Sequence, residues 1–180
     1  MCPYLSMLEA THSVEYLRLV AGLKRANNRP AALRSQEELL LTYGRAFPWR
    51  PLPAGVDRGE PRSCFSNAAC LALAAPRRYL YCEGYAVNVI PVYHGWCLDR
   101  EGFVVDPTWT GDLTPEQPEY FGIPFRHAYV WRIAKRPDAF ALLDNAAQGW
   151  PLCTGKHKIE RAIYEIRVVG AGSARAARQA

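Results

Sequence analysis

The sequence predicts an α+β fold in which N-terminal helices pack on an antiparallel sheet. Apolar residues recur at helical spacing in the first part of the chain, and segments rich in Tyr, Val, Ile, Phe and Trp follow from residue 79 onward. Helices that precede strands, rather than alternate with them, are typical of this fold class. The chain has 180 residues, 49% of them apolar, which suits one domain. We expect that domain to span residues 1–170 and the tail, residues 171–180, to be disordered.

Two helices are predicted in the N-terminal part of the chain. Residues 11–27 place apolar side chains about one helical turn apart, and the sequence NNRP ends the segment. In the next segment, SQEELLLTYG, Ser35 stands three residues before Glu38, which is the pattern of a capping box. Gly44 is a suitable stop, so this segment predicts a second, shorter helix.

A third helix is predicted after a long loop. Residues 46–63 contain four prolines, which disfavour any regular element. The following sequence, CFSNAACLALAAP, consists of good helix formers without an interior glycine, and Pro76 closes it. Cys64 is therefore expected at or near a helix N-terminus.

The second half of the chain predicts mainly strands. Residues 79–99 and 103–109 are rich in β-branched and aromatic residues, and the turn sequence DREG separates them, so we expect antiparallel strands. Beyond them, the sequence predicts a Pro/Gly-rich loop at residues 110–125, a strand at 127–133, a helix at 138–148, and a strand or a helix at 158–169.

Composition limits the partners and the location. The formal net charge is +5, but charged residues make up only 22% of the chain and the surplus is spread out, so nucleic acid is a weakly supported partner. The N-terminal sequence has no basic region followed by an apolar core, and no apolar run reaches the ~18 residues of a membrane span. The six cysteines form no CxxC pair or regular framework. We therefore expect a cytoplasmic protein in a reducing setting, with no membrane partner.

Three residues have the types that a thiol acyl-transfer triad requires: Cys64, His94 and Asp106. A free thiol is only a few per cent thiolate at neutral pH, whereas a helix N-terminus and a nearby imidazolium both favour the anion. Cys64 would have both if His94 lay beside it. A carboxylate on the far ring nitrogen would fix the tautomer of His94, and Asp106 is the candidate.

The strand register tests whether His94 and Asp106 can meet. If DREG closes as a three-residue loop with Gly102 at positive φ, Asp99 pairs with Phe103. Counting inward then places His94 and Asp106 on one sheet face as diagonal neighbours, about 7–8 Å apart at the backbone and within side-chain reach. A four-residue loop would shift the pairing by one residue and put them on opposite faces. A catalytic triad therefore predicts the three-residue loop.

Other interpretations of these residue types carry less support. A cysteine in an apolar helix is more often a packing residue than a nucleophile. Four cysteines fit that description: Cys70, Cys82, Cys97 and Cys153. A zinc site would need a second close ligand pair beside His94 and Cys97, and the sequence has none. The sequence GWPLCTGKH has five residues between its glycines where a phosphate loop requires four, which argues against a nucleotide site. We expect neither a metal nor a cofactor.

The sequences CFSNAACLALAA, YCEGYAV, HGW and VVDPTW together resemble the core of the transglutaminase-like branch of the papain-like cysteine enzymes. In that family a Cys at a helix start is followed by His and Asp on adjacent strands. The resemblance covers about residues 60–110. It implies Cys64 as nucleophile, His94 as general base and acid, and Asp106 as the residue that orients the histidine. With YFGIPF, the same motifs also resemble a group of proteins from bacteria and their phages.

The resemblance leaves the oxyanion hole incomplete, because the Gln that precedes the Cys in papain-type enzymes is missing from DRGEPRS. The backbone N–H of Cys64 is one expected donor. The second donor is open among three residues: Arg62, Trp49 and Asn67.

Several further residues are candidates for contact with a substrate. Four aromatic residues cluster in sequence around the triad and are expected to line its cleft, although aromatic residues in strands are most often core: Trp96, Trp109, Tyr93 and Tyr120. Glu83, a charged residue in an apolar strand, is either a substrate contact or an outward-facing residue, and the outward-facing alternative is favoured.

Two functions from different classes follow from these observations. The first is a cysteine-dependent enzyme that attacks an amide or ester, with a protein or peptide as the expected substrate, and forms a thioester. Water would resolve the thioester in a protease, deamidase or amidase, and an amine would resolve it in a transglutaminase. Hydrolysis is slightly favoured because water needs no second binding site. The alternative is a catalytically inactive module of the same fold that binds a protein or nucleic acid.

Overall fold

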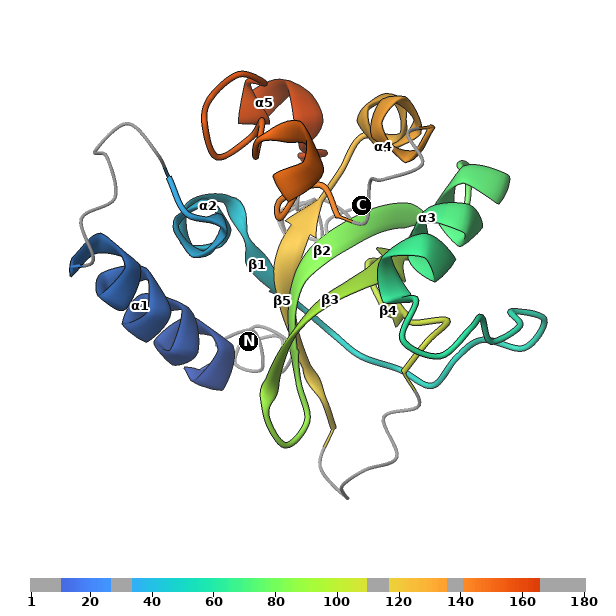
Figure 1. Ribbon diagram of the computed structural model, residues 1–180. Helices are drawn as coiled ribbons and strands as arrows, with labels where there is room; N and C mark the ends of the chain where they lie inside the picture. Colours follow the sequence, from blue (N-terminus) through green and yellow to red (C-terminus); the bar gives the residue numbers. More distant parts are fainter. Residues whose placement is uncertain (1–10, 27–33, 110–116, 136–140, 166–180) are drawn as a thin grey trace, which may run out of the picture.

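The computed structural model describes residues 11–26, 34–109, 117–135 and 141–165. It has an α+β fold with a twisted, antiparallel five-stranded sheet in the order β1-β5-β2-β3-β4 (Figure 1). The strands are β1 (Arg45–Phe47), β2 (Leu80–Val87), β3 (Pro91–Leu98), β4 (Val104–Val105) and β5 (Glu119–Pro124). The helices are α1 (Thr11–Ala26), α2 (Gln36–Tyr43), α3 (Cys64–Ala74), α4 (His127–Ala134), the 3-10 helix η2 (Ala146–Gln148) and α5 (Ile159–Ala162).

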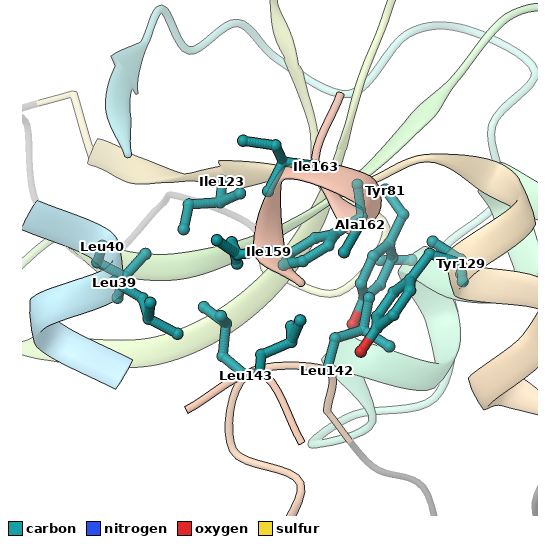
Figure 2. Close-up of a cluster of buried hydrophobic side chains, with 14 of the residues drawn as sticks. Leu39, Leu40, Tyr81, Ile123, Tyr129, Leu142, Leu143, Ile159, Ala162 and Ile163 are labelled. Carbon is teal, nitrogen blue, oxygen red and sulfur yellow. The ribbon is translucent and has the colours of Figure 1, made fainter. Parts of the chain in front are cut away.

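The five α-helices contribute to one hydrophobic core on one face of the sheet. Alternate residues of the central strands point into this core, among them Tyr81 and Tyr85 of β2 and Ile123 of β5. In Figure 2, Leu39 of α2 lies at one side of this core, and Tyr129 of α4 lies at the other side with Tyr81. Full burial of one such large side chain contributes about 1.5–3 kcal/mol.

The other face of the sheet carries a smaller, aromatic cluster. Its centre is formed by Trp96 of β3, Tyr120 of β5 and Phe47 of β1. The ring centroids of Trp96 and Tyr120 lie 5.2 Å apart in an edge-to-face arrangement. Gly122 of β5 makes room for the indole, because a Cβ at that position would lie 2.5 Å from it. Since side chains alternate along a strand, His94 of β3 lies on this aromatic face with Trp96.

The predictions for the first three helices and for the hairpin register are confirmed. α1 and α2 occupy the predicted segments, and both hydrogen bonds of the capping box are present. α3 begins at Cys64. β3 and β4 are joined by the three-residue loop, in which Gly102 has a φ of 88°. The Asp99 N–H donates to the Phe103 carbonyl at 3.0 Å, as that loop requires.

The predicted loop at residues 110–125 and the predicted strand at 127–133 are wrong over their described parts. β5 lies inside the sheet between β1 and β2, and its proline is its last residue, where no ladder hydrogen bond is interrupted. Residues 127–133 belong to α4. Their buried side chains, Tyr129, Val130 and Ile133, follow a helical spacing instead of alternating.

Two other segments also differ from expectation. Within the described part of the predicted helix at 138–148, residues 141–145 are irregular and only η2 is helical. Two backbone N–H groups of this segment donate to the carboxylate of Glu83 instead of forming helical bonds. The predicted loop at 46–63 includes the end of β1. Residues 158–169, left open between strand and helix, contain α5; the part after residue 165 and the predicted disordered tail lie outside the described residues.

None of the helices in the described part of the chain could span a membrane. The longest, α1, has 16 residues and carries several charged side chains, whereas a membrane span needs about 20 mostly apolar residues.

Candidate functional site

Cys64 is the first residue of α3 and is half-buried. The residue before it, Ser63, makes no side-chain capping bond, so the first-turn N–H groups have no side-chain acceptor there. The backbone N–H groups of Phe65 and Gly95 and the His94 ring lie close enough to the Cys64 sulfur to favour its thiolate form. Three groups that can donate a hydrogen bond therefore surround one thiol.

Cys64 and His94 come from opposite faces of the sheet and meet at its edge. α3 packs over β3 and β2 on the helical face, whereas His94 points to the aromatic face. β4 ends at Val105, so the edge of β3 at the level of Gly95 is left open to α3. Gly95 permits the close approach, because a Cβ there would lie 2.9 Å from the Phe65 ring and 3.1 Å from its Cα.

Asp106 holds His94 from the side opposite the thiol. His94 Nε2 and Asp106 Oδ2 are 2.7 Å apart, and the two residues are only 6% and 4% exposed. The Tyr120 hydroxyl donates to the same oxygen at 2.8 Å. The backbone N–H groups of Thr108 and Trp109 donate to Oδ1 at 2.8 and 2.9 Å. These bonds fix the carboxylate and leave Nδ1 of His94 for the Cys64 sulfur.

The three groups shift one another's pKa. Burial favours the neutral thiol, but the hydrogen bond to His94 and the charge of its ring outweigh burial and lower the pKa of Cys64. Burial also favours the neutral imidazole, yet the hydrogen bonds to Asp106 and Cys64 raise the pKa of His94 to about 9. Burial opposes the charge of Asp106 as well, and the hydrogen bond from His94 keeps the pKa of Asp106 below its usual value. These shifts all act toward the charged forms, a thiolate, an imidazolium and a carboxylate in series.

A pocket of about 640 Å³ opens over Cys64 and His94. That volume is in the range of small-molecule sites. Trp109 forms one wall, with its ring centroid 5.5 Å from that of His94 and edge-on to it. Residues of the β2–β3 hairpin form another wall.

The residues predicted to contact substrate have different positions. Trp109 lines the pocket, as expected. Trp96 is fully buried in the aromatic cluster and stacks beside His94 with 6.3 Å between ring centroids, so it supports the histidine and does not line the pocket. Glu83 is 0% exposed and points into the helical core, which makes the outward-facing prediction wrong. Glu83 does not line the pocket either.

Glu83 is tolerated in the core because its carboxylate accepts four hydrogen bonds. The donors are the hydroxyls of Tyr81 and Tyr93 and the backbone N–H groups of Leu142 and Leu143. Burial raises the pKa of Glu83, although these bonds act in the opposite direction. The side chain thus ties the segment after residue 140 to β2.

The three candidates for the second oxyanion donor are not equivalent. The Asn67 amide already donates to the Glu60 carbonyl at 2.7 Å and to Thr108 Oγ1 at 2.8 Å, which ties the start of α3 to the chain after Asp106. Trp49 packs against the aromatic cluster. Arg62 lines the pocket and has a φ of 64°, a left-handed conformation that is uncommon for a residue other than glycine. Arg62 is therefore the side-chain candidate that reaches the pocket.

Sequence reasoning missed the roles of Tyr120 and Gly95. Tyr120 was expected in a loop, so its bond to Asp106 could be found only once β5 was placed in the sheet. Gly95 could have been noticed, because a glycine between two bulky strand residues often marks a close backbone approach.

The remaining cysteines show mixed outcomes. Cys82, Cys97 and Cys153 are buried, which confirms the packing interpretation for these three. Cys70 is exposed, so that interpretation is wrong for it; it lines a separate pocket between α3 and α4. Among the residues that the structure describes, no three His, Cys, Asp or Glu side chains are arranged to hold a metal ion.

Positive charge gathers at the other end of β2, away from this site. Four arginines help to line a separate concavity of about 960 Å³: Arg45, Arg77, Arg78 and Arg100. Asp99 and Glu101 line it too, so its charge is mixed. A nucleic-acid partner stays a prediction.

Comparisons with known proteins leave the site to be interpreted from its own geometry. No protein-family model, curated protein or solved structure matches the chain.

Proposed function

We propose that the protein is a cysteine-dependent acyl-transfer enzyme that acts on an amide or ester through a thioester on Cys64. The observation that carries the proposal is the position of His94, which bonds Asp106 at 2.7 Å and lies close enough to Cys64 to lower the pKa of its thiol. A sulfur out of reach of the histidine would favour the alternative, a binding module without turnover, and this proximity argues against that alternative. The order of the three residues agrees with the resemblance to transglutaminase-like enzymes.

Acylation begins from the thiolate–imidazolium pair. The Cys64 sulfur attacks the carbonyl carbon, a C–S bond forms, and the carbonyl electron pair moves onto oxygen. His94 then gives its proton to the leaving nitrogen or oxygen as the C–N or C–O bond breaks. The products of this step are a thioester and a neutral histidine, which Asp106 keeps in the required orientation.

Deacylation regenerates the starting pair. Neutral His94 takes a proton from water while the water oxygen attacks the thioester, and the C–S bond breaks to release a carboxylic acid and the thiolate. An amine in place of water would give a new amide instead. We favour hydrolysis, by a protease, deamidase or amidase, with a protein or peptide as substrate.

The start of α3 supplies charge stabilisation for the oxyanion. The Cys64 backbone N–H is in the first turn, where no intrahelical acceptor exists, and the helix dipole favours negative charge there. Arg62 at the pocket rim is the proposed second donor.

The proposal is tested by alkylation with iodoacetamide at pH 6, with the modified cysteine located by mass spectrometry. Because the pKa of Cys64 is lowered, we expect it to react at least about tenfold faster than Cys70, which lies on the same helix and is more exposed. A His94→Ala variant should remove that advantage. Equal rates for the two cysteines in the wild type would overturn the activated-thiol proposal.

A second measurement separates an activated thiol from an enzyme. Incubation with 4-nitrophenyl acetate should add one acetyl group to Cys64, seen by intact-mass spectrometry, and the Cys64→Ala variant should stay unmodified. Loss of the acetyl group in water alone indicates a hydrolase. Loss that depends on an added primary amine indicates a transglutaminase.

A further inference from the structure

The tip of the β2–β3 hairpin presents an apolar surface beside the nucleophile. Val89 and Ile90 are 67% and 65% exposed, and Val92 is 41% exposed. All three line the same pocket as Cys64 and His94. Aliphatic side chains that gather on one exposed surface typically mark a binding site, whereas single exposed ones need no explanation.

The apolar surface extends along the β2–β3 hairpin, from the level of His94 toward the hairpin tip. Val92 lies two residues before His94 on β3, so the two share a sheet face about 7 Å apart along the strand. Val89 and Ile90 continue the apolar surface away from the thiol. The sequence between Glu83 and Asp99 contains no Asp, Glu, Lys or Arg, so nothing charged interrupts it.

The opposite side of the pocket is also largely apolar. Phe65, next to the nucleophile, packs against Tyr93 with ring centroids 5.2 Å apart, and Trp109 forms the wall beside His94. Apart from the reacting pair Cys64 and His94, Arg62 is the charged residue in the lining. Away from that pair, a group attached to the carbonyl under attack would therefore be surrounded mainly by carbon, with the Arg62 cation at the rim.

We infer that the pocket selects its acyl donor by an aliphatic group on the acyl side, a chain of several carbons that lies from Val92 toward Ile90. The inference rests on the proposed thioester chemistry and adds the substrate class to it. The apolar group is excluded from water when it binds, and the energy gained grows with the number of methylenes buried.

The test is a series of 4-nitrophenyl esters, acetate, butyrate and hexanoate, with hydrogen succinate as the charged counterpart of butyrate. The rate measured with Cys64→Ala is subtracted as background before kcat/KM is calculated for each ester. Each kcat/KM is then divided by the rate constant of the same ester with a small thiol, which removes differences in intrinsic reactivity between the esters. We expect an increase of about twofold to fourfold per methylene, roughly 15- to 250-fold from acetate to hexanoate.

A double variant, Val89→Thr with Ile90→Thr, keeps the β-branched shape of the hairpin while making its tip polar. The hexanoate-to-acetate ratio should fall at least about fivefold, since the methylenes lose apolar contact. The matched control is Leu19→Gln with Leu23→Gln, two exposed aliphatic residues of α1 at 63% and 57% exposure, which should leave the ratio unchanged. Unchanged alkylation of Cys64 at pH 6 verifies that the hairpin variant keeps an intact nucleophile.

The outcomes separate this inference from the proposed function. Acetylation of Cys64 with a flat or falling chain-length series would overturn the aliphatic selection and leave the enzyme. A faster reaction with hydrogen succinate than with butyrate would do the same, because Arg62 would then govern the choice. Absence of any acyl-enzyme with all four esters would overturn both.

Discussion

Asp106 and Glu83 are two buried carboxylates, one on each face of the sheet, with the same number of hydrogen bonds and opposite pKa shifts. Each accepts four bonds, two from side chains and two from backbone N–H groups. Burial favours the neutral form of both. The pKa of Asp106 is nevertheless lowered, whereas that of Glu83 is raised.

The difference between them is a cation. One of the donors to Asp106 is His94, which is an imidazolium at neutral pH, while all donors to Glu83 are neutral hydroxyl and amide groups. Neutral hydrogen bonds offset part of the cost of burying a charge. A charged partner can outweigh that cost, so that the pKa shift changes sign. The comparison shows that hydrogen-bond number alone does not set the pKa of a buried carboxylate, whereas a cationic partner can.

The largest effect expected from this comparison is on the rate of acyl-enzyme formation. Asp106→Asn leaves a neutral side chain next to His94, which favours the wrong tautomer, and the rate of acyl-enzyme formation should fall about 10⁴-fold. Glu83→Gln is the matched control and should stay within about threefold of the wild type. Both rates are measured by release of 4-nitrophenol. Equal losses in the two variants would contradict the assignment of Glu83 to structure alone.

A smaller effect is expected when the sulfur is moved away from an intact His94–Asp106 pair. Gly95→Ala places a Cβ against the first turn of α3, so Cys64 should shift and its alkylation at pH 6 should slow about 100-fold. Gly22→Ala is the control, because a Cβ at that position in α1 meets nothing within 4 Å. Undiminished reactivity of Gly95→Ala would show that the close approach is not needed.

Two tyrosines test the charge of each carboxylate through stability. Tyr120→Phe removes a donor from charged Asp106 and should lower the free energy of unfolding by about 1.5–3 kcal/mol. Tyr93→Phe removes a donor from Glu83 and should cost only about 0.5–1.5 kcal/mol at pH 4.5, where the raised pKa keeps Glu83 mostly neutral. Urea unfolding at that pH measures both, and a larger loss for Tyr93→Phe would reverse the comparison.

The smallest effects are two pH dependences of opposite sign. The lowered pKa of Asp106 means that its stabilising contribution is present above the unfolded value, near 3.8, and is lost as pH falls through the lower folded value. The raised pKa of Glu83 means that its contribution is present below the unfolded value, near 4.5, and is lost as pH rises through the folded value. Unfolding of Asp106→Asn and Glu83→Gln from pH 3 to 7, each against the wild type, should therefore show opposite slopes. Slopes of the same sign would refute the assigned charges.

The backbone geometry around the candidate site was predicted from sequence where local interactions decide it. The start of a helix at Cys64 follows from a proline-rich loop and a run of helix formers. The shared face of His94 and Asp106 follows from the length of a single turn, because one more residue in the loop would have put their side chains on opposite faces of the sheet. These features depend on residues that are at most 12 positions apart in the chain.

Features that depend on distant partners could not be predicted in this way. Glu83 appeared exposed because a lone carboxylate in a strand is costly to bury, and its donors at Leu142 and Leu143 lie 59 and 60 residues away. β5 was taken for a loop because its proline and glycine are poor strand residues in isolation, yet Gly122 is the position over which the Trp96 indole packs.

The order of residues along the chain was enough to identify the candidate triad, the helix that begins at the thiol and the register that brings the histidine to the carboxylate. Three features required the folded molecule: the approach of the thiol to the histidine around the open edge of β3, the support of Asp106 by Tyr120, and the place of Glu83 in the core. Helix starts, turns and alternation are set by neighbours in the chain, whereas burial and the charge of a carboxylate are set by whatever groups the fold brings against it.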